Sequence, residues 1–178
     1  IEDALRAGHM LFGENKVQEA LDKWPALKEK YPQSTVHLIG PLQTNKVRTA
    51  VKLFDAIQSV DRPKLAHALA RVMQEEGRHI PIYIQVNTGE EEQKAGVSFD
   101  DLDEFYRLCH DELGLNVEGL MCIPPLDDHP GPHFALLSRA AKKLGLSGLS
   151  MGMSGDYEQA IWQGATLIRV GTSIFGAR

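Results

Sequence analysis

The sequence predicts an α/β fold, a (β/α)8 TIM barrel whose first strand is absent from the sequence. Short apolar runs alternate with stretches of helical periodicity along the chain, which favours parallel strands with helices outside. These runs end in Gly or Ser turns where the next helix begins, as the strands of such a barrel do. The chain opens on a helix, however, and only seven runs follow, so we expect the first strand to precede Ile1. An open parallel sheet is the alternative.

Seven short runs of apolar and β-branched residues predict the strands. In chain order they are residues 9–12, 35–40, 54–60, 80–86, 117–123, 148–151 and 166–170. The fourth run is the clearest, because Ile82, Ile84 and Val86 alternate with Tyr83 and Gln85. Such alternation is typical of a strand whose two faces meet different surroundings.

Helical periodicity and helix-end signals predict the helices between these strands. In chain order they are residues 2–7, 17–31, 43–51, 61–73, 98–109, 134–144 and 154–163, with a short stretch at 173–176. Pro25 falls inside the second helix and predicts a kink. Asp61 is the expected N-cap of the fourth helix, with Pro63 in its first turn. Ser98 followed by Asp101 three residues later resembles a capping box.

The composition is that of an ordinary soluble domain, and it excludes several function classes. The 178 residues are 43% hydrophobic and 24% charged, enough for one core, although about 200 residues is the short end for a TIM barrel. The net charge of −5 without a basic block gives no support for nucleic-acid binding, and no apolar run reaches the length of a membrane span. Cys109 and Cys122 lack metal-ligand spacing and indicate buried thiols in a reducing cytoplasm. We expect one domain over residues 1–178.

The last quarter of the chain carries the strongest signal for a ligand. Two strands run into small-residue turns, at residues 154–156 and 171–173, and the helix between them has Ser154 as its expected N-cap and Gly164 at its end. Free backbone N–H groups and hydroxyls at such turns bind phosphate. The alternative is two ordinary turns with capping serines. In TIM barrels the last two turns commonly bind phosphate, so we favour a phosphate site.

Two charged positions near the mouth of the barrel are candidates for chemistry. Arg169 lies in the otherwise apolar run LIRVG, where a charge is costly unless it is paired or used. Its alternative is a structural ion pair with a neighbouring strand. Lys94 and Glu91 follow the fourth strand and could reach the mouth, but a solvated loop is the simpler interpretation.

The seven histidines show no metal-ligand spacing. His37 alternates with apolar residues in a strand and is interpreted as packed, whereas His129 and His133 flank a Pro-Gly-Pro turn and indicate a surface loop. No G-x-S-x-G elbow or Ser-His-Asp order is present. Metal catalysis and acyl transfer therefore have little support.

Four segments of the chain form a specific set of motifs: FGENKVQEA (12–20), HLIGPLQTNK (37–46), GLMCIPP (119–125) and the long terminal segment beginning SMGMSGDYEQ (150–178). Together they closely resemble the YggS/PROSC family of pyridoxal phosphate (PLP) homeostasis proteins. The resemblance implies a single-domain barrel like the N-terminal domain of alanine racemase. It also implies PLP held as a Schiff base, no established turnover, and a role in vitamin B6 supply.

The resemblance also implies which residues bind the cofactor. The implied set is Ser154, Gly171 and Thr172 for the phosphate, Arg169 for the pyridine nitrogen, Asn15, Ile39 and Met151 around the ring, and Lys94 nearby. One departure concerns the Schiff-base lysine, which in this family ends the first strand in a run similar to AVSK. No such run is present, so we expect this lysine upstream of Ile1 and assign no catalytic residue here.

The Arg169 assignment separates the candidate functions. An arginine keeps its proton and only donates to the pyridine nitrogen, and a neutral ring nitrogen is a poor electron sink. This suits a PLP carrier or at most a racemase-like reaction, and it argues against a transaminase. A PLP-dependent amino-acid racemase is therefore the alternative, and a sugar-phosphate aldolase or isomerase is a third hypothesis. We expect a cytoplasmic monomer that binds no nucleic acid and no membrane, with apo forms of PLP-dependent enzymes as recipients.

Overall fold

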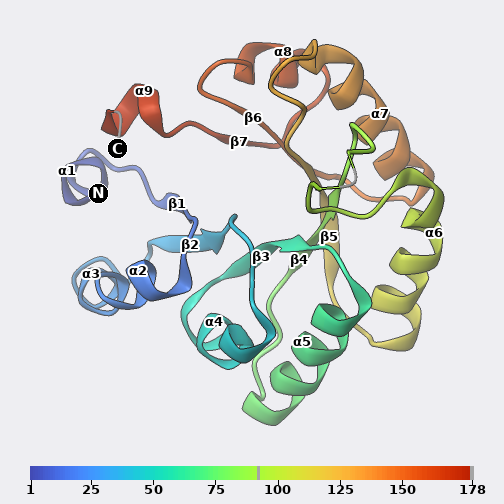
Figure 1. Cartoon of the computed structure of the whole chain (residues 1–178). Coiled ribbons are helices and arrows are strands. Elements are labelled where there is room, and N and C mark those ends of the chain that lie inside the picture. Colours follow the sequence, from blue (N-terminus) through green and yellow to red (C-terminus); the bar gives the residue numbers. More distant parts are fainter. Residues whose placement is uncertain (92, 177–178) are drawn as a thin grey trace.

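A computed structural model describes residues 1–91 and 93–176. Within that part of the chain, seven parallel strands follow one another around the sheet in sequence order (Figure 1). They are β1 (Leu11–Glu14), β2 (Thr35–Leu38), β3 (Ala56–Val60), β4 (Ile82–Val86), β5 (Val117–Cys122), β6 (Gly148–Met153) and β7 (Leu167–Arg169). The sheet curls into a nearly closed ring that is open between β7 and β1, which confirms the predicted barrel over the open-sheet alternative.

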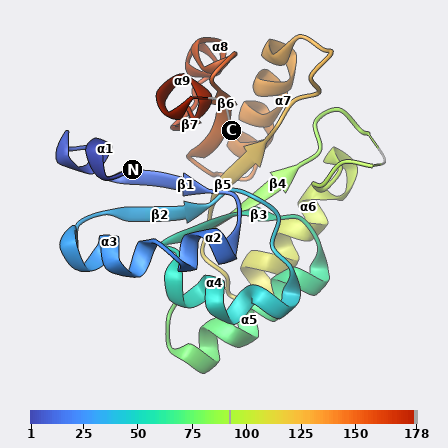
Figure 2. The ribbon, with the colours of Figure 1, turned by 60° about the vertical axis from the view of Figure 1, so that its left-hand side comes forward.

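Helices alternate with the strands and lie on the outside of the ring (Figures 1 and 2). The α-helices are α1 (Glu2–Arg6), α2 (Val17–Leu21), α3 (Trp24–Lys30), α4 (Val47–Leu53), α5 (Pro63–Glu76), α6 (Phe99–Arg107), α7 (Pro130–Lys143), α8 (Tyr157–Trp162) and α9 (Thr172–Phe175). A 3-10 turn, η1 (Thr44–Lys46), precedes α4, and a π-helical turn, η2 (Leu108–Glu112), continues α6. The order strand–helix–strand places every strand's carboxyl end at one rim, called the mouth below.

The main core lies between the outer faces of the strands and the helices. Val36, Leu38 and Ile84 on the strands are fully buried against helix residues such as Leu69 and Phe134. In β1 the exposure alternates, with Phe12 buried, because only one face of this strand meets the helices. Within residues 1–91 and 93–176, no helix is long and apolar enough to cross a bilayer.

Three helix-end predictions can be compared directly with the structure. The predicted kink at Pro25 is wrong, because the helix stops at Leu21 and a new one starts with Pro25 in its first turn. A proline fits there, since the first turn needs no N–H donor, whereas it breaks a helix interior. Asp61 is not the N-cap of α5; Arg62 occupies that position. The Ser98 cap is confirmed, because its Oγ accepts a hydrogen bond from the backbone N of Asp101 at 3.1 Å.

The segment around His133 also corrects a prediction. The Pro-Gly-Pro sequence is the first turn of α7 and not a surface turn, so His133 lies within the helix. Its side chain is buried, with Nδ1 3.0 Å from the carbonyl oxygen of Thr88 and Nε2 3.1 Å from Oδ2 of Asp128. The hydrogen bond from His133 lowers the pKa of Asp128. His133 therefore joins the loop after β4 to the loop after β5.

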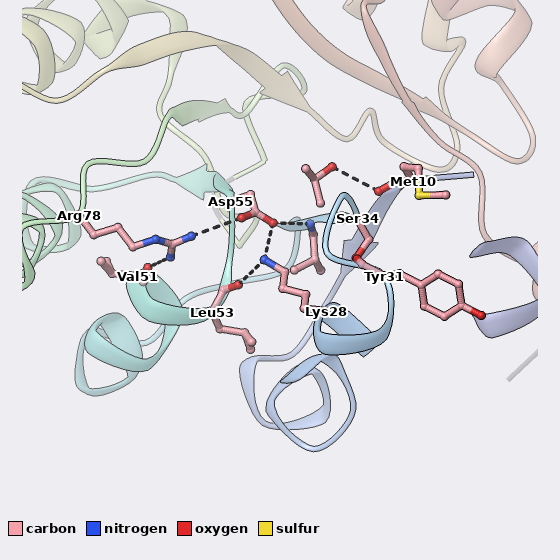
Figure 3. A network of polar contacts seen from close by, with 10 residues as sticks. Met10, Lys28, Tyr31, Ser34, Val51, Leu53, Asp55 and Arg78 are labelled. Atoms are coloured by element: carbon pink, nitrogen blue, oxygen red, sulfur yellow. Dashed lines mark hydrogen bonds and ion pairs between the residues drawn. The ribbon is translucent and has the colours of Figure 1, made fainter. Parts of the chain in front are cut away.

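A network of hydrogen bonds and ion pairs around Asp55 lies at the rim opposite the mouth (Figure 3). Oδ2 of Asp55 accepts from Nζ of Lys28 at 2.6 Å and from the backbone N of Val36 at 2.7 Å. Its Oδ1 accepts from the Arg78 guanidinium at 3.3 Å, and Lys28 also donates to the carbonyl of Leu53 at 3.1 Å. These contacts tie α3, β2, α4 and the segment after α5 to the start of β3.

Candidate functional site

The last two turns of the barrel lie side by side at the mouth. Oγ of Ser154, in the turn after β6, accepts a hydrogen bond from the backbone N of Gly171 at 3.3 Å and from that of Ser173 at 3.4 Å. Space is open around both turns, since a Cβ at Gly155 or at Gly171 would meet no atom within 4 Å. The structure therefore brings together backbone donors and hydroxyls that the sequence assigned to one anion site.

Ser154 does not cap the helix after it, as the sequence had predicted. Asp156 occupies the N-cap position of α8, and its Oδ1 accepts from the backbone N of Met153 at 2.5 Å. The hydroxyl of Ser154 is turned instead toward the neighbouring turn. Gly164 follows the end of α8 with φ +92°, which confirms its predicted role at the helix end. With α8 six residues long and α9 four, the anion site rests on the paired turns and not on a helix end.

Arg169 ends β7, two residues before Gly171, and is partly buried. One terminal nitrogen donates to Oγ of Ser150 at 2.7 Å and the other to the carbonyl oxygen of Cys122 at 2.7 Å. No ion pair of Arg169 is found among the described residues, so the structural ion pair considered above is not what holds it. Burial lowers the pKa of Arg169, while the Cys122 thiol and the Asp156 carboxylate act in the opposite direction.

A partly buried cation whose acceptors among the described residues are all neutral is an unusual arrangement. Transfer of a charge out of water is costly, and natural proteins normally offset it with a counter-charge or use the charge on a ligand. The guanidinium of Arg169 has five N–H groups, of which Ser150 and Cys122 engage two. The remaining donors are available to an acceptor at the mouth.

Ser150 and Gln58 extend the hydrogen bonds of Arg169 into the barrel, and the sequence analysis did not single them out. Oγ of Ser150, on β6, donates to Oε1 of Gln58 on β3 at 2.5 Å. Nε2 of Gln58 lies 2.8 Å from Nδ1 of His37 on β2, so His37 is hydrogen-bonded as well as packed. A polar residue within each of the apolar runs AIQSV and LSMGM is the signal that could have identified this pair.

The ends of β1 and β2 also come together. A Cβ at Gly40 would lie 2.1 Å from the carbonyl oxygen of Asn15, so the close approach of these two loops requires glycine. Ser59 fixes the second loop from β3, because its Oγ donates to the carbonyl of Gly40 at 2.6 Å. Ile39 covers Gly13, since a Cβ there would lie 2.9 Å from its Cδ1. Asn15 and Ile39 are thus neighbours at the mouth.

Two residues of the implied set lie differently. Met151 is fully buried in the core between strands and helices, and it alternates along β6 with Ser150, whose side chain points into the barrel. Its side chain therefore packs behind the strand. Lys94 lies in the loop between β4 and α6, where its Nζ is 2.5 Å from Oε2 of Glu91. Both side chains of this pair are about one-third exposed, at 34% and 30%. Thr172 begins α9 beside Gly171 and is exposed.

The cysteines and acidic residues offer no second reactive centre. Both thiols are buried, and burial raises the pKa of Cys109 and of Cys122 to about 12, so they remain protonated at neutral pH. Among the residues that the structure describes, no group of three or more His, Cys, Asp or Glu side chains could hold a metal ion.

Comparison with known proteins shows the family to which the chain is similar. The family model for the N-terminal domain of alanine racemase matches residues 1–178. The chain is 38% identical over 188 residues to the pyridoxal phosphate homeostasis protein of Vibrio alginolyticus, covering 100% of this chain and 81% of that protein. The corresponding Escherichia coli K12 protein is 35% identical, with 100% of this chain and 80% of that protein covered.

A solved structure shows the same fold. PipY of Synechococcus elongatus PCC7942, determined with PLP bound, superposes with a TM-score of 0.89 at 39% identity, covering 98% of this chain and 85% of that chain. The structure of PipY without PLP gives the same TM-score of 0.89 at 40% identity, covering 98% of this chain and 86% of that chain.

Proposed function

Since this chain belongs to the pyridoxal phosphate homeostasis proteins, a family built on the alanine racemase N-terminal domain, we propose that it binds PLP at the mouth of the barrel and serves PLP homeostasis. PipY, which is similar over nearly the whole chain, has been determined with PLP bound. The observation that carries the proposal is the contact of Ser154 with the turn at Gly171, beside an Arg169 that forms no ion pair with any of the described residues.

The donor set at the last two turns fits the phosphate of PLP. Ser154 contributes a hydroxyl proton, with the exposed hydroxyl of Thr172 nearby, and the N–H groups of Gly171 and Ser173, which here donate to Oγ of Ser154, would turn to the phosphate when it binds. Hydrogen bonds from such groups to a dianion are charge-assisted and therefore strong. Because Gly171 has open space where a side chain would be, a phosphate oxygen can approach the backbone.

Arg169 fits the opposite edge of the cofactor. It is rigidly held by Ser150 and the Cys122 carbonyl, and its other N–H groups remain available to the pyridine nitrogen. Asn15 and Ile39, brought together at the ends of β1 and β2, are proposed to line the ring. Met151 packs behind β6 in the core, and neither Met151 nor Lys94 is assigned a contact with the ring.

This arrangement favours binding over turnover. PLP, when bound to an enzyme, supplies an electron sink for carbanion chemistry. Arg169 donates a hydrogen bond and keeps its proton, so this chain leaves the ring nitrogen unprotonated and the sink weak. A weak sink argues against a transaminase but is compatible with a carrier or a racemase. Because the similar curated proteins are named pyridoxal phosphate homeostasis proteins, we propose a carrier that supplies apo forms of PLP-dependent enzymes and place a racemase second. The two buried, unpaired thiols fit a reducing compartment such as the cytoplasm.

Equilibrium dialysis of the chain against PLP, read by its visible absorption, tests this proposal. We expect saturable binding that inorganic phosphate weakens competitively, and we expect Arg169→Gln to reduce it. Arg139→Gln is the matched control, because Arg139 is an exposed arginine on α7. Absence of saturable binding, or binding that phosphate leaves unchanged, would refute the proposed site. Inversion of a single-enantiomer amino acid at enzymatic rates would instead favour the racemase.

A further inference from the structure

A line of hydrogen bonds crosses the inside of the barrel from β7 to β2, and the proposed PLP site uses only its first member. Arg169 donates to Ser150 at 2.7 Å, Ser150 donates to Gln58 at 2.5 Å, and the Gln58 amide nitrogen lies 2.8 Å from Nδ1 of His37. The four residues come from four strands, β7, β6, β3 and β2. We call this the Arg169–His37 line.

Arg169 sets the donor and acceptor of each hydrogen bond in the Arg169–His37 line. A guanidinium can only donate, so Oγ of Ser150 must accept from Arg169. The Ser150 hydroxyl is then free to donate to Oε1 of Gln58, which turns the amide NH₂ toward His37. Nδ1 of His37 must accept that bond, so neutral His37 carries its proton on Nε2.

The groups around His37 agree with a neutral ring. Burial lowers the pKa of His37, and the cation of Lys28 lowers it further, while the carboxylate of Asp55 acts in the opposite direction. A protonated ring would present Nδ1–H to the NH₂ of Gln58 and break the line. The amide could turn over to accept that proton, but the Ser150 hydroxyl would then lose its acceptor.

We propose that Ser150 and Gln58 are positioning residues for Arg169, which hold its guanidinium against the pyridine edge and link that orientation to the Nε2–H form of His37. The inference rests on the proposed function, since it assigns these residues a role toward bound PLP. Ser150 is the one side chain that holds Arg169 within the described residues, because the other partner is the backbone carbonyl of Cys122. Both positioning side chains are buried, and neither belongs to the implied PLP-binding set.

The first arm of the test needs no cofactor. In ¹⁵N-histidine-labelled protein, long-range ¹H–¹⁵N correlation reports which ring nitrogen of His37 carries the proton. We expect the Nε2–H form in the unaltered chain and a mixture of both forms in Ser150→Ala and in Gln58→Met. Ser34→Ala is the matched control, because Ser34 is a buried serine at the opposite rim whose Oγ donates to the Tyr31 carbonyl at 2.7 Å. A pure Nδ1–H form in the unaltered chain would overturn the inference.

The second arm measures the affinity for PLP and the visible absorption of bound PLP. Ser150→Ala and Gln58→Met should weaken PLP binding about three- to tenfold and shift its visible absorption maximum, as expected for a loosened charged hydrogen bond. Ser150→Thr keeps the hydroxyl and should restore both, while Ser34→Ala should change neither. Circular dichroism melts confirm that each variant is folded.

The two arms separate this inference from the proposed function. If the unaltered chain binds no PLP while the His37 form changes as described, the proposed function fails and the Arg169–His37 line still exists. If folded Ser150→Ala binds PLP with unchanged affinity and absorption, the positioning role is refuted whatever the form of His37.

Discussion

The two rims of this barrel treat a partly buried charge in opposite ways. At the rim away from the mouth, Asp55 meets two cations, Lys28 and Arg78, and a backbone N–H group (Figure 3). At the mouth, Arg169 is held by a hydroxyl and a carbonyl, with no carboxylate in ion-pair contact among the described residues. Among the described residues, the Asp55 carboxylate forms ion pairs and the Arg169 guanidinium forms none.

This difference distinguishes a charge that stabilises the fold, Asp55, from a charge that is available to a ligand, Arg169. A charge removed from water loses its hydration, and other groups must replace those interactions. A full set of partners within the protein replaces them in every state of the folded chain. Asp55 is therefore explained by the fold alone. Arg169 is oriented but not neutralised, which is the state expected of a group whose acceptor arrives with a ligand. Barrels of this kind generally separate the two tasks in the same way, with stability at one rim and ligands at the other.

The largest effect on stability is expected at Asp55. Asp55→Ala removes the carboxylate that Lys28, Arg78 and the backbone N–H of Val36 share, and leaves the two cations only their backbone-carbonyl acceptors. The free energy of unfolding should therefore fall by about 2–3 kcal/mol. Urea denaturation measures this loss, and PLP affinity of the folded variant should stay unchanged. Asp103→Ala is the control, because its pair with Lys143 is exposed and should contribute less than about 1 kcal/mol. A loss of PLP affinity in folded Asp55→Ala would contradict the separation of the two rims.

Arg169→Gln should show the reverse pattern. PLP affinity should fall about tenfold to a hundredfold, the range for losing a hydrogen bond to a charged group. Stability should change by less than about 1 kcal/mol, because the cost of desolvating the cation disappears together with its two hydrogen bonds. Arg78→Gln is the matched arginine at the other rim, where stability should fall and PLP affinity should not. Equal effects of the two substitutions on PLP affinity would remove the distinction between them.

A smaller effect is expected at Ser154. Ser154→Ala removes one hydroxyl donor and leaves the N–H groups of Gly171 and Ser173 in place, so PLP affinity should fall about fivefold, or about 1 kcal/mol. Ser34→Ala removes a buried hydroxyl at the opposite rim and should lower stability without changing PLP affinity. Calorimetric titration with PLP measures the first effect. An unchanged affinity in Ser154→Ala would move the phosphate to another part of the mouth.

Local signals predicted most of the fold. Apolar runs and helical stripes depend on near neighbours in sequence, so all seven strands and the Ser98 cap could be recognised. The errors occurred where a short stretch fits two conformations. Pro25 suits a kink or a first turn, and Ser154 suits a helix cap or a contact with the neighbouring turn. In each case the surrounding tertiary contacts selected the conformation.

The site could be predicted in part for the same reason. Arg169 was conspicuous in an apolar strand, and the small residues at the last two turns are a local signal. Gln58 and Ser150 were missed because they are 92 residues apart and meet only when the barrel curls. A single polar residue in an apolar strand does not indicate which strand carries its partner. That pairing is a property of the ring of strands.

His37 interacts with groups at both rims, and its titration gives the last and smallest predicted effect on stability. Its ring takes part in the line that ends at Arg169, yet Asp55 at the opposite rim raises its pKa while burial lowers it overall. Below about pH 6.5, the unfolded chain binds a proton at this position that the folded chain resists, so the free energy of unfolding decreases as the pH falls. His37→Gln removes this contribution, so the stability of this variant should decrease less than that of the unaltered chain between pH 8 and pH 5.

Asp55→Asn should lower the pKa of His37 further, as measured by NMR titration, because the carboxylate that raises this pKa is gone. If the pKa of His37 stayed unchanged in Asp55→Asn, the charge at the rim opposite the mouth would not reach the Arg169–His37 line, and the two rims would be electrostatically independent.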